Sequence, residues 1–245
     1  MSPPVFIADQ AGLRASDRVV LDGDEGRHAA LVRRIRVGER VELTDGSGHL
    51  ASCVVAEVRR DGLVCDVVGR RDVDLPQPRV VVVQALPKGD RGETAVETMT
   101  EVGVDEIVPW TSARSVTRWK GERGEKALRR WRSTAREAAK QSRRAWLPVV
   151  PTPLSTDDVV TLLEAAALGV VLHEEATIPI GDVDPPAAGT LVVVVGPEGG
   201  LSPEEVDRFG SAGAMSVRLG PTVLRTSTAG TVAAGILQAR SLRWW

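Results

Sequence analysis

Residues 191–205, LVVVVGPEGGLSPEE, begin with five apolar residues, which are followed by three glycines, a proline and a glutamate. Ser202, Pro203 and Glu205 have the spacing of a capping box with proline in the first turn, which predicts a helix start. Glycines between a buried strand and a helix expose backbone N–H groups to a ligand. The glycine spacing matches neither a dinucleotide fingerprint nor a P-loop, which disfavours pyrophosphate. We therefore expect a pocket lined by backbone groups, with a purely structural turn as the alternative.

A second loop of similar form is LGPTVLRTSTAG, residues 219–230, in which Gly220-Pro221 precedes a helix expected from about residue 226. A third strand end is predicted in VVLHEEA, residues 170–176. The carboxyl ends of neighbouring parallel strands meet at one edge of a sheet, where open α/β folds bind their ligands. We expect the three loops to form a crevice there, suited to an adenosine held by backbone groups.

The net charge of −2 conceals a concentrated basic segment. Residues 114–144 contain twelve Lys and Arg residues against three Glu residues, a net charge of +9, so the remainder of the chain is strongly acidic. A basic stretch in an acidic protein indicates binding of a polyanion, above all nucleic acid. The alternative is a solvated helix face.

The composition is that of an ordinary globular protein, with 42% apolar and 26% charged residues. No apolar run approaches the ~20 residues that cross a bilayer, and the first residues lack the pattern of a signal peptide. We expect a cytoplasmic protein without a membrane segment. Cys53 and Cys65 lie in strand-like runs and are expected as buried thiols. No cysteine or histidine has a zinc-binding spacing, so no metal is predicted.

Two regions of the chain differ in pattern. Residues 17–70 contain four β-branched runs separated by Asp/Gly turns, DRVVL, ERVELTD, HLASCVVAEV and GLVCDVVGR, which predict a small β-rich barrel. Between the first two runs, Ala29, Leu31, Val32 and Ile35 indicate a short amphipathic helix. Residues 71–79 are rich in Pro and Asp and predict a linker. We place the domain boundary there, giving domains of residues 1–72 and 73–245.

From residue 79 strands and helices alternate, which predicts an α/β domain, Rossmann-like, with a parallel sheet of five or six strands. RVVVVQAL, residues 79–86, is a strand of the kind that is buried on both faces. Helices are expected in ETAVETMTEVG, residues 93–103, then at 124–142, 156–167 and 203–211, and from about residue 226.

Five segments, in order along nearly the whole chain, together resemble one family. They are RHAALVRRIRVGE, QALPKGDRGETAVETMTEVGVDEIVP, REAAKQSRRAWLPVV, GPEGGLSPEE and LGPTVLRTSTA. In these segments the chain resembles the RsmE family, the 16S rRNA uridine-N3 methyltransferases of the SPOUT class. The resemblance implies a PUA-like, RNA-binding β-barrel followed by a SPOUT domain with a C-terminal trefoil knot, which strand spacing alone does not reveal. It also implies homodimers.

The knotted loops of this family bind S-adenosylmethionine. Carried over by position, the cofactor-binding residues are Leu172, His173, Glu174, Gly196, Pro197, Glu198, Gly199, Gly200, Leu219, Gly220, Leu224, Arg225, Thr226, Thr228 and Ala229. One departure lies in the last loop, where many relatives read L-R-T-E-T-A and this chain has Ser227 in place of the glutamate. Ser227 is expected only to cap the last helix and is left out of the site.

Methylation at N3 of uracil requires loss of a proton, which spreads negative charge onto the two flanking carbonyl oxygens. Arg225 is the first candidate to stabilise that charge, with a structural hydrogen bond to loop carbonyls as the alternative. Lys88 and Arg91 are candidates for base or phosphate contact, with simple surface exposure as the alternative. Glu198 completes the catalytic set of Arg225 and Lys88, either as a base with a raised pKa or, as we prefer, in an orienting role.

RNA contacts are expected from the two basic regions and from the loop after the first α/β strand. The residues are Arg27, Arg33, Arg34, Arg36, Lys88, Arg91, Arg136, Lys140, Arg143 and Arg144. Trp119, Trp131 and Trp146 are expected mainly in core packing.

The resulting prediction is an S-adenosylmethionine-dependent enzyme that forms 3-methyluridine in 16S rRNA, within the small ribosomal subunit. One alternative is a SPOUT methyltransferase acting on another nucleoside of rRNA or on tRNA. Another is a non-catalytic RNA-binding assembly factor. The missing fingerprint disfavours a Rossmann dehydrogenase.

Overall fold

The computed structural model describes residues 3–244, apart from the side chains of residues 10 and 11. The chain forms two compact units. The first unit contains the residues up to Leu75 together with Ala139–Leu147, and the second contains Pro76–Ala138 and the residues from Pro148 onward. The first unit therefore draws on two separate stretches, whereas the sequence predicted a single division of the chain.

A five-stranded sheet forms the first unit, with the strand order β1-β3-β4-β5-β2. Its strands are β1 (Val5–Ile7), β2 (Arg18–Leu21), β3 (Arg40–Thr44), β4 (His49–Arg59) and β5 (Gly62–Asp72). The four predicted β-branched runs became β2 to β5, which pair antiparallel. Two elements were not predicted: β1, which pairs parallel with β3, and the helix α1 (Gln10–Ala15).

The predicted amphipathic helix of this unit is wrong in one respect. The chain forms α2 (Gly23–Arg27) and then a π-helical turn, His28–Val32. Ala29 and Ile35 are buried as expected, but Leu31 and Val32 are 58% and 68% exposed. A π-turn closes i→i+5 hydrogen bonds and therefore does not hold the i, i+3, i+4 stripe that the prediction assumed.

The two cysteines are buried in this sheet as free thiols, which confirms their prediction. Burial raises the pKa of the Cys53 thiol to about 12 and that of the Cys65 thiol to about 11. Both side chains therefore stay protonated at neutral pH and act as small apolar residues.

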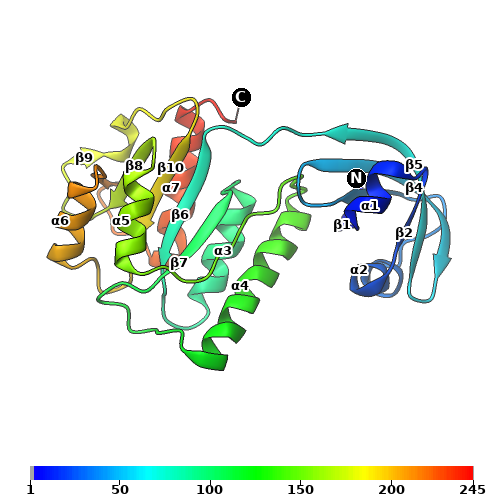
Figure 1. Cartoon of the computed structure of the whole chain (residues 1–245), viewed down its shortest axis with the longest axis horizontal. Coiled ribbons are helices and arrows are strands. Elements are labelled where there is room, and N and C mark those ends of the chain that lie inside the picture. The colour runs from blue at the N-terminus through cyan, green and yellow to red at the C-terminus, as the bar shows by residue number, and fades with distance from the viewer. Residues whose placement is uncertain (1–2, 245) are drawn as a thin grey trace. The chain divides into compact units, whose positions relative to one another are not determined.

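The second unit contains a six-stranded sheet with the order β7-β6-β10-β8-β11-β9 (Figure 1). Every paired strand in it is parallel, which confirms the predicted α/β class. The strands are β6 (Arg79–Ala85), β7 (Glu106–Trp110), β8 (Leu168–Leu172), β9 (Ile178–Pro179), β10 (Thr190–Val195) and β11 (Met215–Arg218). The helices are α3 (Arg91–Glu101), α4 (Gly121–Gln141), α5 (Thr156–Glu164), α6 (Pro203–Ser211) and α7 (Thr226–Arg240).

Helices cover both faces of this sheet, and β6 shows why it reads as a continuous apolar run. Val80 and Val82 pack with residues of α3, α4 and α7, whereas Val81 and Val83 pack with residues of α5 and α6. Successive side chains of a strand point to opposite faces, so a strand buried on both sides needs apolar residues at every position.

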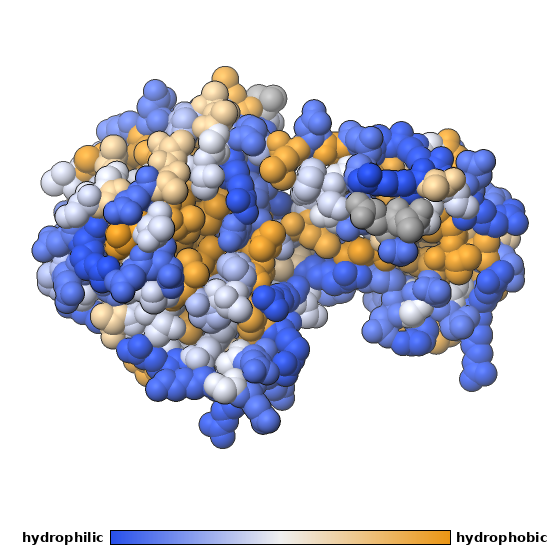
Figure 2. Space-filling model, viewed as in Figure 1, coloured by the Kyte–Doolittle hydropathy of each residue, from blue (hydrophilic) through white to orange (hydrophobic). Residues whose placement is uncertain are grey.

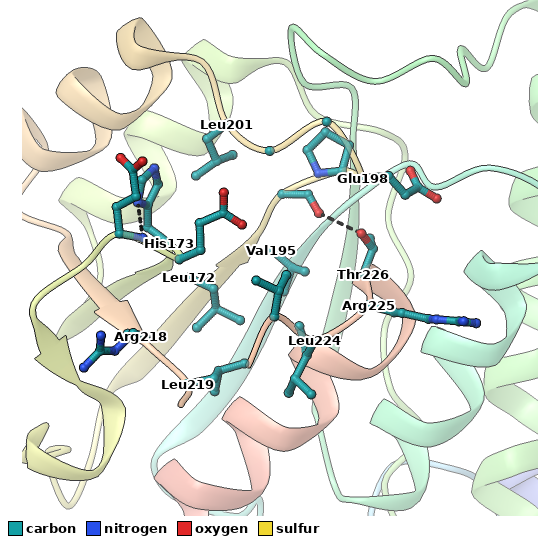
Figure 3. A pocket seen from close by; sticks show the side chains of 18 of the residues that line it. Leu172, His173, Val195, Glu198, Leu201, Arg218, Leu219, Leu224, Arg225 and Thr226 are labelled. Carbon is teal, nitrogen blue, oxygen red and sulfur yellow. Dashed lines mark hydrogen bonds between the residues drawn. The ribbon is translucent and has the colours of Figure 1, made fainter. Parts of the chain in front are cut away.

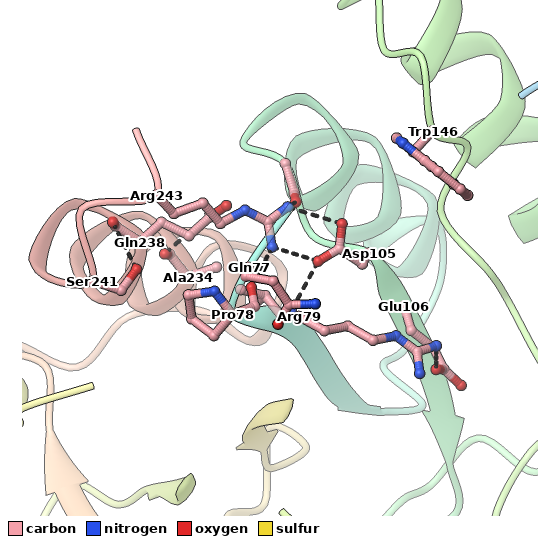
Figure 4. Close-up of polar contacts among 12 residues, drawn as sticks. Gln77, Pro78, Arg79, Asp105, Glu106, Trp146, Ala234, Gln238, Ser241 and Arg243 are labelled. Atoms are coloured by element: carbon pink, nitrogen blue, oxygen red, sulfur yellow. Dashed lines mark hydrogen bonds and ion pairs between the residues drawn. The ribbon is translucent and has the colours of Figure 1, made fainter. Parts of the chain in front are cut away.

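A buried ion pair fixes the chain after α7 to the edge of the core. The guanidinium of Arg243 donates to the carboxylate of Asp105 through two nitrogens and to the carbonyl oxygens of Pro78 and Gly103 (Figure 4). The two charged side chains are 6% and 5% exposed. Asp105 also accepts a hydrogen bond of 2.8 Å from the backbone N–H of Val80, at the beginning of β6.

In residues 3–244 we find no helix that is both long enough and apolar enough to cross a membrane. Hydrophilic residues cover most of the visible face of the protein, and they gather around the beginning of α4 (Figure 2).

Candidate functional site

A cavity of about 990 Å³ lies at the carboxyl edge of the six-stranded sheet. β10, β8 and β11 are neighbours there, so the loops that follow them are brought together as predicted. The lining includes Leu172–Glu175, Val195–Leu201 and Arg218–Thr226, together with Ala229 and parts of α6 (Figure 3). Of the fifteen residues predicted to hold a cofactor, all but Thr228 line this cavity.

The inner wall of the cavity is apolar. Leu172, Val195 and Leu219 come from the ends of three neighbouring strands, and Leu201 and Leu224 come from the loops (Figure 3). Five apolar side chains next to exposed loop backbone suit a flat apolar ring whose edge atoms hydrogen-bond to main-chain groups.

The glycine-rich turn after β10 is tight and is bonded to the loop after β11. The N–H of Gly200 donates to the carbonyl of Pro197 at 2.9 Å, and Gly200 has a φ of +70°, which favours glycine. The hydroxyl of Thr226 donates to the carbonyl of Gly196 at 3.3 Å (Figure 3). This bond ties the beginning of α7 to the turn, so the two loops form one wall.

The capping box predicted at α6 is present. The Ser202 hydroxyl accepts from the N–H of Glu205 at 3.1 Å, and the Glu205 carboxylate accepts from the N–H of Ser202 at 2.9 Å. Glu205 is only 3% exposed, and its second oxygen accepts from the N–H of Ala113 at 2.7 Å. One carboxylate thus joins the start of α6 to the segment between β7 and α4.

Arg114 is a cavity residue that the sequence analysis did not assign to the site. Its guanidinium donates to the carbonyl of Gly199 at 3.1 Å, and the residue lines the cavity. The sequence contained one indication, since Arg114 begins the basic segment. Nothing local placed that segment beside a loop about 85 residues later in the chain.

Glu198 is held in place by hydrogen bonds at the rim of the cavity. One of its oxygens accepts from the backbone N–H of Lys88 at 3.1 Å and from the guanidinium of Arg91 at 2.9 Å. Partial burial raises the pKa of this carboxyl, but hydrogen bonds from backbone amides and Arg91 outweigh it, so the pKa lies below its ordinary value. A carboxylate stabilised in this way is a poor base, which favours the orienting role.

Arg225 is exposed at the beginning of α7, and its side chain extends away from the apolar wall (Figure 3). Its carbonyl accepts from the N–H groups of Thr228 and Ala229, which starts the helix. The hydroxyl of Thr228 donates to the same carbonyl at 3.1 Å and lies outside the cavity lining, so the prediction of Thr228 as a cofactor ligand is not supported by its position. Lys88 is exposed and reaches Glu198 only through its backbone.

The residues predicted to contact RNA differ in their exposure. Arg33, Arg34 and Arg36 are exposed beside the π-helical turn of the first unit. Lys140, by contrast, is 9% exposed, and its ammonium lies 3.0 Å from the carboxylate of Glu25. We therefore assign Lys140 a structural role and leave it out of the proposed RNA contacts.

The remaining predicted cations lie at varied positions. Arg27 is exposed and pairs with Asp24, Arg143 is exposed, and Arg136 and Arg144 are half-buried.

Of the tryptophans, Trp131 is buried, and the ring centre of Trp119 lies 5.0 Å from that of Trp131, as expected for core packing. Within the described part of the chain, no group of three or more His, Cys, Asp and Glu residues is placed to hold a metal ion.

The sequence and the fold are similar to those of known RNA methyltransferases. Residues 74–238 match an RNA methyltransferase domain family, and residues 21–68 match an RNA methyltransferase PUA domain family. The chain is 52% identical over 229 residues to the ribosomal RNA small subunit methyltransferase E of Mycobacterium tuberculosis, covering 92% of this chain and 87% of the relative. The protein of the same name from Bacillus subtilis is 31% identical over 218 residues, covering 85% of this chain and 85% of the relative.

A solved structure is similar over nearly the whole chain. It is a ribosomal RNA small subunit methyltransferase E from Neisseria gonorrhoeae bound to S-adenosyl methionine. The two chains are 25% identical, with a TM-score of 0.83, and the similarity covers 97% of this chain and 98% of the other.

Proposed function

Because the chain belongs to the RNA methyltransferase family, we propose that it transfers a methyl group from S-adenosylmethionine to 16S rRNA of the small ribosomal subunit, at N3 of a uridine. The single observation that carries the proposal is the cavity, in which fourteen of the fifteen predicted cofactor residues come together from three loops. The relatives named for small-subunit rRNA methylation support the substrate class.

The cavity fits the proposed cofactor. Its volume of about 990 Å³ lies at the upper end of the usual range for small-molecule sites. The apolar wall of Leu172, Val195 and Leu219 suits an adenine ring, and the turn at Gly196–Gly200 exposes backbone groups to the polar atoms of an adenosine. When bound, S-adenosylmethionine supplies an electrophilic methyl group on a sulfonium.

The protein side chains would act on the uracil. We assign Arg225 the stabilisation of negative charge on the uracil oxygens as the N3 proton leaves. Glu198 is ionised, and it would hold the guanidinium of Arg91 at the rim for contact with the base or with a phosphate. Lys88 remains a candidate for phosphate contact through its exposed side chain.

We further propose a PUA-like domain of residues 1–72, a SPOUT domain of residues 73–245 with a trefoil knot, and a homodimer. The two family matches support these domains, because residues 21–68 lie inside the first and residues 74–238 lie inside the second. The strand order supports the knot, because β10 lies between β6 and the earlier strand β8. Analytical ultracentrifugation tests the homodimer, and a sedimenting monomer at micromolar concentration would contradict it.

RNA contacts are proposed for arginines of both units, most of which are exposed. Four of them, Arg27, Arg33, Arg34 and Arg36, lie beside the π-helical turn of the first unit. The exposed Arg91 and Arg143 and the half-buried Arg136 and Arg144 also remain proposed contacts. Removing a phosphate contact should weaken RNA binding and reduce its salt dependence.

Nucleoside mass spectrometry of 16S rRNA from a strain that lacks the gene tests the substrate and the position. We expect 3-methyluridine to disappear and to return when the gene is restored. Retained 3-methyluridine with loss of another methylated nucleoside, in rRNA or in tRNA, would support the alternative substrate. Calorimetry with S-adenosylmethionine separates an enzyme from an assembly factor, because an assembly factor need not bind the cofactor.

A further inference from the structure

The basic segment begins at the cavity rather than on a remote surface. Arg114 lines the cavity, and Arg118 and Lys120 follow it on the way to α4. All three residues are exposed, as are Arg123 and Lys126 in the first turns of α4. Hydrophilic residues cover this part of the surface in Figure 2. Five exposed cations, with the exposed Glu122 and Glu125 among them, therefore follow one another in sequence from the cavity rim to the first turns of α4.

Arg114 is fixed at the end of this run by Glu205. The buried carboxylate of Glu205 accepts from the N–H of Ala113, the residue before Arg114, and from the N–H of Ser202. Arg114 in turn donates to the carbonyl of Gly199 through one nitrogen, Nη1. A guanidinium carries five N–H donors, so donors remain for a ligand at the rim.

We propose that Arg114 binds a backbone phosphate of the RNA next to the nucleotide that enters the cavity, and that Glu205 is the residue that positions it. The inference rests on the proposed function and adds a substrate contact to it. The net positive charge of the exposed segment that follows Arg114 favours a phosphate chain over the single carboxylate of the cofactor, because an extended polyanion can engage several cations at once. A guanidinium suits phosphate oxygens through paired hydrogen bonds.

The test compares Arg114→Ala with the wild-type protein in steady-state methylation of small-subunit rRNA, with calorimetry of S-adenosylmethionine alone. We expect the KM for RNA to rise about tenfold, while kcat and the cofactor affinity stay within about twofold. The slope of log affinity for RNA against log salt should fall by about 0.7 to 0.9, the value for one phosphate. Arg208→Ala, which removes an arginine that pairs with Asp157 on α5, should match the wild type.

Glu205→Gln tests the positioning role. We expect a raised KM for RNA, and no further rise when Arg114→Ala is added, because Glu205 acts through Arg114. Additive effects on KM in the double variant would assign Glu205 a merely structural role. If Glu205→Gln fails to fold, Arg114→Ala still decides the central point.

The outcomes separate this inference from the proposed function. A wild-type protein that neither binds S-adenosylmethionine nor methylates RNA would overturn the function itself. An active wild type whose Arg114→Ala variant keeps its KM for RNA, or loses cofactor affinity instead, would overturn only the phosphate contact.

Discussion

At the scale of single residues, the rim of the cavity contains one carboxylate whose role can be decided. Glu198 accepts hydrogen bonds from the Lys88 amide and the Arg91 guanidinium, and its pKa lies below the ordinary value. A general base would impose its own pKa on the rate. Glu198→Gln should therefore lower methylation only several-fold and leave the pH–rate profile unchanged. Loss of an acidic limb from the profile would contradict the orienting role.

The same carboxylate should contribute to stability in a defined pH range. Because the pKa of Glu198 is lowered in the folded protein, the stabilisation is present above the pKa of the unfolded chain and is lost as pH falls through the folded value. The partly exposed pair with Arg91 is worth at most about 1 kcal/mol. Urea unfolding should show a constant difference between wild type and Glu198→Gln from about pH 5.5 to 8, shrinking below about pH 4. A difference that grows on acidification would contradict this assignment.

Arg225 is the residue on which the proposed chemistry depends most. It is exposed at the cavity and starts α7 through its backbone, which any residue can supply. Arg225→Ala should lower kcat about 100-fold or more, as for loss of one donor to a developing oxyanion. Calorimetry should give the same affinity for S-adenosylmethionine within about twofold. Unchanged turnover would remove Arg225 from the mechanism.

Single residues could be placed in the site from the sequence only where a local motif marked them. Gly196–Gly200 and the residues around Arg225 follow strand ends and precede helix starts, so both loops were recognisable. Arg114 and Glu205 were not assigned a role in the site, because the bond from the N–H of Ala113, the residue before Arg114, to Glu205 joins segments about 90 residues apart. Thr228 lies in the first turn of α7, and the motif of the preceding loop does not determine which side chains of that turn face the cavity.

At the scale of elements, α7 lies very close to the sheet. A Cβ on Gly230 would lie 2.9 Å from the sulfur of Met99 and 3.2 Å from Val82. Gly210, in α6, has no atom within 4 Å of the same position. Gly230→Ala should lower the free energy of unfolding by about 1 kcal/mol, because overpacking of about 1–3 kcal/mol exceeds the helix-propensity gain.

Gly210→Ala is the matched control for this prediction. It should raise the free energy of unfolding by up to about 1 kcal/mol, since only the propensity gain applies. Chemical denaturation measures both variants. A change of the same sign in the free energy of unfolding of both variants would show that space at Gly230 does not limit the packing of α7.

Helices and strands with a clear start signal or continuous pattern were predicted well. α6 has the predicted bounds because Ser202, Pro203 and Glu205 mark its start. The two-residue strand β9 and the π-helical turn were missed, since neither leaves a periodic pattern.

At the scale of the whole molecule, the two units depend on contacts between segments far apart in the chain. In the first unit, the indole of Trp146 donates to the carbonyl of Val73 at 2.8 Å, and the N–H of Leu147 donates to Gly46 at 2.9 Å. These bonds, with the pair of Lys140 and Glu25, join Ala139–Leu147 to the first unit. No local pattern indicates them, so the sequence could not predict this part of the division.

The ion pair of Arg243 and Asp105 holds the end of the second unit together (Figure 4). Arg243→Ala would leave the buried carboxylate without this guanidinium and free two carbonyl oxygens from their donor. The free energy of unfolding should fall by about 3–5 kcal/mol. Arg59→Ala, which removes an exposed pair with Glu57, should cause no measurable change. Equal stability of the two variants would contradict a structural role for the ion pair of Arg243 and Asp105.

Methyl transfer to N3 of a uridine in small-subunit rRNA is the reaction that we propose for this protein. Its most direct test is incubation of the purified protein with S-adenosylmethionine carrying an isotopically labelled methyl group and with unmodified small-subunit RNA, followed by nucleoside mass spectrometry. We predict labelled 3-methyluridine as the product, and much less of it from Arg225→Ala. Label in a different nucleoside, or no label in RNA at all, would contradict it.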